Sequence, residues 1–392
     1  MWGARAIMFI NGPVITGTGP IAESIRVRQG RIDAVNESPD SRDLVIDLDR
    51  GIVVPGLINA HDHLELNSFG RMKWRTQYDN VRGWIADFQP RFETDAQLAM
   101  ARPDTLADRV WVGGLKNLLS GVTTVCHHNP LHRVLRLKFP VRLVTRFGLS
   151  HSLQIDGARV GPAHRATPRG WPWIVHAAEG VDEEACSEID TLDSLGCLDA
   201  STILVHGVAI NGEAKRLLAR GVSLVWCPTS NQFLFGRTAD VRPFDADGRL
   251  ALGTDSRLSG EGDLLDELRA ARSTGQISDE SLIRAVTAQA AAVLRLPTAG
   301  RLAPGLPADL AVFRRNAVDP LESIVSSTRA DLRLVMRDGQ PMVATPDLAD
   351  IFRARRESFA PVRVDGSERL MAKWIARRVA RLIIAEPGLE VA

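Results

Sequence analysis

The middle of the chain repeats one order of elements: an apolar run typical of a strand, a polar residue at its end, and a helix. The run Thr202–Val205 ends in His206, the helical pattern Glu213–Arg220 follows, and Leu250–Leu252 leads to Asp255. Strands that alternate with helices predict a parallel sheet of the α/β class. We therefore predict a (β/α)8 TIM-type barrel, whose site lies at the carboxyl ends of its strands.

A pair of histidines ends the apolar stretch that begins at Gly51. His61 and His63 are one residue apart, so in a strand both rings lie on one face and Asp62 lies on the other. Two imidazoles on one face can hold a metal ion. A lone His-x-His is equally compatible with two ordinary polar residues at a strand end, so further ligands must come from elsewhere.

Other predicted strands of the barrel also end in residues able to bind a metal. His176 follows the apolar run Trp173–Val175, with Glu179 three residues later, and His206 and Asp255 end two further strands. Imidazole nitrogens with one carboxylate suit zinc, and a catalytic zinc site leaves a position open for water. Each residue alone could be a hydrogen-bonded strand end, but together they favour a metal site.

Both ends of the chain read as short strands separated by Gly, Pro, Asn and Asp turns. We read the strands of residues 1–55 as antiparallel. The same pattern of short strands and turns occurs again at Gly300–Arg315. We therefore predict a small composite β-sandwich domain, built from 1–55 and 299–345 beside a barrel over 56–298, with C-terminal helices over 346–392. The last helix carries an apolar stripe from Leu370 to Ile383, which would suit packing on the barrel, a homodimer contact or a membrane surface.

Composition excludes several classes of protein. The 392 residues carry a formal net charge of +1 and are 24% charged, which gives no nucleic-acid footprint. No apolar run approaches the roughly 20 residues of a membrane span. The four cysteines form no C-x-x-C pair, and the chain opens without a signal-peptide pattern. We expect a cytoplasmic protein that acts on a small molecule and binds neither nucleic acid nor membrane.

Seven motifs, spread over most of the chain, occur in the order found in one family. The motifs are PGLINAHDHL (Pro55–Leu64), SGVTTV (Ser120–Val125), HAAEG (His176–Gly180), LVHG (Leu204–Gly207), CPTSN (Cys227–Asn231), LGTDS (Leu252–Ser256) and GRLAPGLPADLAVF (Gly300–Phe313). With these motifs the sequence resembles the amidohydrolase superfamily of metal-dependent hydrolases, in its deaminase and triazine-hydrolase branch, which includes enzymes similar to cytosine deaminase.

The resemblance implies a set of metal ligands and a metal count. In mononuclear members the ligands would correspond to His61, His63, His176 and Asp255 of this chain. Binuclear members add a carboxylated lysine at a strand end, whereas the one lysine between Gly121 and His176, Lys138, precedes a predicted strand. We therefore expect one divalent ion, zinc first and Fe²⁺ as the alternative.

The resemblance also implies the reaction. Metal-activated water would attack an sp² carbon of a nitrogen heterocycle, with His206 and Asp255 orienting and deprotonating the water and Glu179 giving a proton to the ring or leaving nitrogen. The chain would then be a hydrolase of carbon–nitrogen bonds other than peptide bonds, first of all an aminohydrolase. Hydrolysis of a cyclic amide or loss of another leaving group from a heteroaromatic ring is the alternative. A non-catalytic scaffold on the same fold would be expected to lack a ligand or the acid, and none is missing.

Two departures from the family pattern concern the substrate side of the site. Trp226 replaces the histidine that many deaminases carry before Cys-Pro, which predicts a different substrate wall. The stretch from Cys126 to His176 is short for two strand–helix units, so the barrel is either shortened around strands 3–4 or hides a strand in Leu149–Ile155. A long loop over Glu65–Pro90 is expected to cover the site. The candidate substrate contacts lie in this loop or beside predicted strand ends. They are Glu65, Arg71, Trp74, His127, His128, His151 and Trp173.

Overall fold

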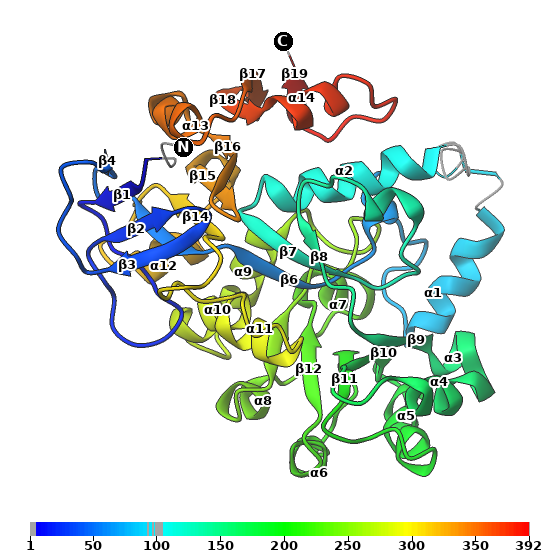
Figure 1. Ribbon diagram of the computed structural model, residues 1–392. Helices are drawn as coiled ribbons and strands as arrows, with labels where there is room; N and C mark the ends of the chain where they lie inside the picture. The colour runs from blue at the N-terminus through cyan, green and yellow to red at the C-terminus, as the bar shows by residue number, and fades with distance from the viewer. Residues whose placement is uncertain (1–4, 92–93, 96–97, 99–104, 392) are drawn as a thin grey trace.

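The computed structural model describes residues 5–91, 94–95, 98 and 105–391, and its centre is a TIM-barrel-like α/β fold (Figure 1). Eight parallel strands follow one another in two sheets, and a parallel bridge between Asp62 and Asp255 joins the first strand to the segment after the last. The first sheet contains β6 (Leu57–Asp62), β7 (Val122–His127) and β8 (Arg142–Leu143). The second contains β9 (Gly148–Ser152), β10 (Trp173–Ala177), β11 (Thr202–His206), β12 (Ser223–Trp226) and β13 (Leu250–Leu252).

Helices surround these strands, and local side chains define where several of them begin. The carboxylate of Asp182 accepts a hydrogen bond from Ala185 N at the start of α5, and Asp263 forms a capping box with Asp266 at the start of α9. The barrel helices are α2 (Leu106–Leu118), α3 (Leu153–Asp156), α4 (Val160–Ala166), α5 (Glu183–Ser194), α6 (Ala214–Ala219), α7 (Pro228–Phe235), α8 (Arg242–Ala246), α9 (Leu264–Ser273), α10 (Asp279–Ala285) and α11 (Ala288–Val293).

The sequence pattern of Glu280–Leu294 predicts one helix, whereas the structure has two, α10 and α11. The carbonyl of Val286 accepts a hydrogen bond of 2.8 Å from the backbone N–H of Ile58 in β6, outside the helix. Thr287 then has φ −135° and ψ −107°, which no α-helix contains. The helix breaks because this carbonyl pairs with the first barrel strand.

The short stretch between Cys126 and His176 holds two strands. The residues Val141–Phe147 predict a strand, of which only the two residues of β8 form one, and β9 lies where a strand could be hidden. The described residues between β8 and β9 form no helix. Because β9 reads Gly-Leu-Ser-His-Ser, its polar residues mask the apolar pattern by which strands are recognised.

Strands from both ends of the chain pair beside the barrel. β5 (Ile52–Pro55) pairs antiparallel with β14 (Leu310–Phe313), and Figure 1 shows the blue N-terminal strands beside β14. A four-stranded sheet has the order β3-β2-β1-β4, in which β1 and β4 are parallel, not antiparallel as predicted. Its strands are β1 (Ile7–Ile10), β2 (Ile25–Arg28), β3 (Arg31–Val35) and β4 (Leu44–Asp47).

The prediction of helices throughout 346–392 is wrong over residues 359–372, which form a β-hairpin. Asp365 and Gly366 at its turn both have left-handed φ, +48° and +76°, as a two-residue hairpin turn requires. The hairpin extends a seven-stranded sheet, and α14 packs back on the barrel through Trp374, whose ring centroid lies 6.3 Å from that of Trp111 in α2. The sheet has the order β19-β17-β18-β16-β15-β14-β5, and its remaining strands and the neighbouring helices are β15 (Leu332–Arg337), β16 (Gln340–Ala344), β17 (Phe359–Val364), β18 (Ser367–Ala372), β19 (Leu389–Val391), α12 (Pro320–Val325), α13 (Ala349–Arg355) and α14 (Lys373–Val379).

The region predicted as one long loop after β6 also contains regular structure. A short 3₁₀ turn, η1 (Leu64–Leu66), follows the histidine pair, and α1 (Val81–Phe88) occupies the end of the region. Asn80 begins α1, because its side chain accepts a hydrogen bond from Gly83 N. No helix in the described part of the chain has the length and apolar character needed to cross a bilayer.

Candidate metal centre and active site

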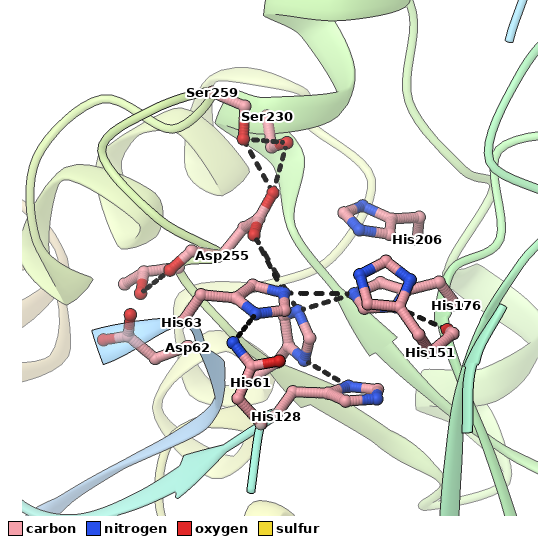
Figure 2. Close-up of polar contacts among 12 residues, drawn as sticks. His61, Asp62, His63, His128, His151, His176, His206, Ser230, Asp255 and Ser259 are labelled. Atoms are coloured by element: carbon pink, nitrogen blue, oxygen red, sulfur yellow. Dashed lines mark hydrogen bonds and ion pairs between the residues drawn. The ribbon is translucent and has the colours of Figure 1, made fainter. Parts of the chain in front are cut away.

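Polar side chains from four barrel strands meet above the carboxyl ends of the barrel (Figure 2). His61 and His63 come from the end of β6, His176 from β10, His206 from the last position of β11, and Asp255 from the segment after β13. His206 and Asp255 have left-handed φ values of +75° and +52°. This backbone conformation is uncommon for residues other than glycine, and here it sets the direction in which the two side chains leave the strand ends.

Four of these side chains present atoms at the spacing of a metal-ligand shell. His176 Nε2 lies 3.1 Å from His61 Nε2 and 3.3 Å from His63 Nε2. Asp255 Oδ1 lies 3.6 Å from His63 Nε2 and 3.9 Å from His61 Nε2. Ligand atoms about 2.0–2.2 Å from one ion, at angles near 90–110°, lie about 2.9–3.6 Å apart. Three of the four printed separations fall within or close to this range, and the fourth, 3.9 Å, is slightly longer. His61 belongs to two groups of potential metal ligands, one with His63 and Asp255 and one with His176 and His206, and the ligand atoms of each group lie within 4.8 Å of one another.

The three ligand-type histidines are in the neutral form that a metal requires. Burial lowers the pKa of His61, His63 and His176 well below the usual value, and the neighbouring histidines lower it further. A neutral imidazole has one nitrogen with a free lone pair, so which nitrogen carries the proton decides whether the ring can bind.

Hydrogen bonds around the cluster assign the proton of two of these rings. His128 Nε2 lies 3.0 Å from the Ser150 carbonyl, to which it donates, so His128 Nδ1 is free to accept from His61 Nδ1 at 3.2 Å. His176 Nδ1 donates to the His151 carbonyl at 2.7 Å. Both His61 and His176 therefore direct an unprotonated Nε2 at the candidate metal position.

Two hydroxyl groups orient the carboxylate of Asp255. Ser230 and Ser259 donate to Asp255 Oδ2 at 2.8 and 2.7 Å, which leaves Oδ1 facing the histidines. Sequence reasoning missed both serines. Ser230 belongs to the CPTSN motif, which was recognised. Its contact with Asp255 could not be predicted, because the two residues come from different strand ends.

Glu179 and His206 face each other beside this group. Glu179 Oε1 lies 3.5 Å from His206 Nε2, and His206 Nδ1 donates to Asn231 Oδ1 at 2.8 Å, so Nε2 is the unprotonated nitrogen. Burial raises the pKa of Glu179 well above its usual value, with further increases from the charges of Asp255 and Glu188. Burial likewise lowers the pKa of His206. At neutral pH the pair thus consists of a protonated carboxylic acid and a neutral imidazole.

A buried carboxylate that sequence reasoning did not single out holds the turn before Glu179. Glu188 Oε2 accepts a hydrogen bond of 2.7 Å from Ala178 N, and Glu188 Oε1 accepts one of 2.7 Å from Gln154 Nε2. Ala178 has a left-handed φ of +54°. The bond keeps this turn in place, and Glu179 directly follows it. Burial raises the pKa of Glu188 to about 7.

Two of the predicted substrate contacts lie in the histidine cluster. His128 stacks on His176 with ring centroids 4.4 Å apart, and the His151 ring lies 4.6 Å from that of His176. His151 Nδ1 is buried and has no hydrogen-bond partner among the described residues. His151 is thus placed to present a polar atom to a bound molecule, whereas His128 already uses both ring nitrogens.

Other predicted contacts point away from this cluster. His127 lies outside the barrel wall, where Leu64 N is 3.3 Å from its Nδ1, and Glu65 accepts a hydrogen bond from Asn129. Arg71 forms an ion pair of 2.7 Å with Glu261. Trp74 lies against Phe88 and under the Arg91 guanidinium.

Trp173 does not contact the site, so its prediction as a substrate contact is wrong. It is the first residue of β10, whereas His176 is near the carboxyl end, and three residues of strand span about 10 Å. Its ring is fully buried against His164, at a centroid distance of 4.9 Å.

Trp226 is also fully buried and does not form a substrate wall. Its indole N–H donates to Thr238 Oγ1 at 2.6 Å, and the same oxygen accepts from Asn231 Nδ2 at 3.1 Å. Because Asn231 Oδ1 is the partner of His206, Trp226 acts on the site through Thr238 and Asn231.

The amino-acid sequence of the chain is similar to those of known proteins. The profile of the Amidohydrolase family matches residues 172–342. A 5-methylthioadenosine/S-adenosylhomocysteine deaminase of Natronomonas pharaonis is 26% identical over 383 residues, which cover 80% of this chain and 86% of that protein. An 8-oxoguanine deaminase of Pseudomonas aeruginosa is 31% identical over 185 residues, 41% of each chain.

Comparison with solved structures gives the same fold. The zinc complex of the atrazine chlorohydrolase of Arthrobacter aurescens TC1 superposes with a TM-score of 0.72 at 20% identity, over 89% of this chain and 98% of that one. A zinc-bound adenosine deaminase from Xanthomonas campestris gives 0.67 at 19% identity, over 89% and 98%. The solved structures show the fold, and the family profile and the sequence relatives support membership of the amidohydrolase superfamily, in its deaminase-like branch.

Proposed function

We propose that this protein is a metal-dependent aminohydrolase that removes an amino group, as ammonia, from a ring carbon of a purine-type heterocycle. As a member of its superfamily it is a hydrolase of carbon–nitrogen bonds. The names of the sequence relatives, which are deaminases of adenosine derivatives and of 8-oxoguanine, support a purine ring as the first substrate class to test.

The metal we propose is a single divalent ion held by His61, His63, His176 and Asp255, with zinc before iron. The mutual distances of 3.1–3.9 Å between these ligand atoms and the tautomers of His61 and His176 support this assignment. Such an ion, when bound, supplies a Lewis acid that brings the pKa of a water from 15.7 to about 7.

The side chains around the ligands provide the proton transfers. Asp255 Oδ1 and the unprotonated Nε2 of His206 orient the attacking water and take its proton as oxygen adds to the sp² carbon. The protonated carboxyl of Glu179 gives its proton to the ring nitrogen, which accepts the electron pair of the C=N bond. The proton taken from water then passes to the exocyclic amine, which leaves as ammonia. The ring nitrogen returns its proton to Glu179.

The observation that carries this proposal is a buried acid and a buried neutral base side by side. Glu179 Oε1 and His206 Nε2 are 3.5 Å apart, and burial moves their pKa values in opposite directions. The carboxylic acid is kept protonated next to three neutral histidines. A hydrogen-bonded pair with a purely structural role would not require this.

The division of the chain into domains around this site is also a proposal. We infer that 56–298 form the catalytic barrel, shortened by the missing helix between β8 and β9, and that the two end sheets form a composite β-sandwich from 1–55 and 299–345. The pairing of β5 with β14 supports a unit built from both chain ends.

The direct test is ammonia release by the zinc-loaded protein from a panel of ring compounds. The panel contains aminopurines and their nucleosides, 5-methylthioadenosine, S-adenosylhomocysteine, 8-oxoguanine, aminopterins, aminotriazines and cyclic amides. We expect ammonia from at least one aminopurine and loss of that activity when a chelator removes the metal. Ring opening of a cyclic amide without ammonia release from any amine would instead establish the alternative hydrolase.

A further inference from the structure

A second group of metal-ligating side chains lies outside the barrel wall, at the end of β7. Glu65 in η1, His127 at the end of β7, and His132 just before η5 (Arg133–Arg136) bring one potential ligand atom each within 4.8 Å of one another. None of these residues belongs to the group at the barrel mouth. Of the nine histidines of the chain, two belong to this second group and His164 lies outside both, while six rings gather at the barrel mouth: His61, His63, His128, His151, His176 and His206.

Two atoms of this second group are buried without a partner. His127 is fully buried, and neither its Nε2 nor Glu65 Oε2 has a hydrogen-bond partner among the described residues. These two atoms are 3.6 Å apart. A buried polar atom without a partner is unfavourable, and a bound water or ion is one way to satisfy it. The separation is that of two ligand atoms around one ion.

The surroundings orient both groups for a cation. Glu65 Oε1 accepts a hydrogen bond of 2.6 Å from Asn129 Nδ2, which turns Oε2 toward His127. Leu64 N donates a hydrogen bond of 3.3 Å to His127 Nδ1, and the ring also has a backbone hydrogen-bond contact with Asp62. Binding of a cation at Nε2 therefore requires the other tautomer, in which Nδ1 carries the proton and donates to the Asp62 carbonyl.

We propose that Glu65, His127 and His132 bind a second divalent cation of the zinc class, separate from the ion at the barrel mouth. Two imidazoles and one carboxylate are a common zinc ligand set that leaves a position for water. Glu65 and His132 are partly exposed, which gives the cation a path from solvent. This site does not depend on the proposed reaction.

The second cation would act on the first site through one amide. Asn129 Nδ2, which donates to Glu65 Oε1, also lies 3.1 Å from Nδ1 of His63. As a donor to Nδ1 it leaves the His63 proton on Nε2, so His63 binds the first ion through Nε2 only in the other tautomer. A cation that fixes Glu65 therefore also fixes Asn129 beside a ligand of the first ion. Its role would be to hold this part of the β6 and β7 ends in place.

The experiment counts zinc ions per full-length chain. Protein stripped with a chelator is dialysed against zinc at a series of buffered free concentrations, and bound metal is measured by inductively coupled plasma mass spectrometry. We expect two zinc ions per chain for the wild type, one for His132→Ala, one for His176→Ala and none for the double variant. Bound Co²⁺ gives a second readout, because the His132 variant should lose one component of the visible spectrum.

The matched control is His164→Ala, which removes the histidine outside both groups and should still bind two ions. A wild type that saturates at one ion, lost entirely in His176→Ala, would overturn the proposal. Two ions retained in His132→Ala would overturn it as well, because the second ion would then lie elsewhere. Zinc stoichiometry in His176→Ala reports on the second site even if no substrate is ever turned over.

Discussion

Glu179 is the residue on which the chemistry of the site depends most. Its pKa is raised, first by burial, so it holds a proton at neutral pH and can give it to a ring nitrogen. In Glu179→Gln we expect activity to fall about 10²–10⁴-fold, the usual contribution of such proton transfer. Zinc content should stay at the wild-type level, because Glu179 is not a proposed ligand. Near-normal turnover by this variant would remove Glu179 from its role.

His128 should control metal affinity without binding the metal. It accepts from His61 Nδ1 and donates to the Ser150 carbonyl, so it fixes the tautomer in which His61 Nε2 is free. We expect His128→Ala to weaken zinc binding about 10–100-fold, as for other residues that orient a ligand. His128→Asn, which can still accept from His61, should recover part of the loss. Competition with a zinc-binding dye measures both, and equal affinity in His128→Ala and wild type would contradict the assignment.

Glu188 should make stability depend on pH. Burial raises its pKa in the folded protein to about 7, from 4.5 for the model carboxyl, so the folded state holds this proton more tightly than the unfolded state. Its contribution is complete below pH 4.5 and is lost as the pH rises through about 7. The loss is on the order of 3 kcal/mol, from about 1.4 kcal/mol per pKa unit.

Glu188→Gln removes this titration while still accepting from Ala178 N. Gln154 Oε1, which is buried without a partner in the described structure, could accept from the new amide. The free energy of unfolding of the wild type, relative to that of the variant, should therefore be smaller at pH 8 than at pH 4. Urea unfolding of both proteins at the two pH values measures this difference. An identical difference at both values would mean that Glu188 does not titrate as proposed.

At the scale of elements, one buried ion pair joins α2 to the strand that carries the first two ligands. Lys116 and Asp62 are 1% and 0% exposed and 3.1 Å apart, and Lys116 also donates to Thr254 Oγ1 at 2.9 Å. Thr254 N in turn bonds to the His61 carbonyl at 3.0 Å. This network holds β6 and the segment after β13 together beneath the candidate metal.

Removing one partner of the pair should be costly. In Lys116→Met the Asp62 carboxylate is left buried without its cation, which costs about 3–5 kcal/mol. The double variant Lys116→Met, Asp62→Asn should recover part of that loss, because no buried charge remains. Urea unfolding of the two variants measures the difference, and a double variant less stable than Lys116→Met would contradict the ion-pair argument.

Sequence patterns predicted the elements whose side chains follow a single period. The apolar residues of Thr105–Ser120 recur at helical spacing and predict a helix, which is α2, and the strand over Leu250–Leu252 is β13. The patterns failed where long-range contacts decide the structure, as at Val286, whose carbonyl pairs with β6. The Asp365–Gly366 turn was a local signal of a hairpin that the apolar stripe of residues 370–383 obscured.

The same limit applies to the site. Strand-end positions predicted where His61, His63, His176 and Asp255 lie, because the carboxyl ends of barrel strands meet. They could not predict His128 rather than His127 as the inward residue, since adjacent side chains point to opposite sides of a strand and the exact strand end decides. Nor could they predict Glu188, whose partner Ala178 is ten residues away in the preceding turn.

At the scale of the whole molecule, the C-terminal segment is fastened to the loop that carries Asp255. The fully buried Glu386 carboxylate binds Arg257, two residues after Asp255, at 2.7 Å and Arg329 at 2.6 Å. Arg378 of α14 also pairs with Asp108 of α2 at 2.7 Å. The last residues of the chain thus support the barrel next to the candidate metal centre, and Figure 1 shows this red segment along α2.

In the proposed metal centre, side chains from three distant strand ends hold one ion with an acid beside it. Anomalous X-ray diffraction from crystals of the zinc-loaded protein, collected on both sides of the zinc absorption edge, locates that ion. We predict a strong peak about 2.0–2.2 Å from Nε2 of His61, His63 and His176 and from Asp255 Oδ1. Fully loaded crystals with no peak among these four atoms would rule out this metal centre.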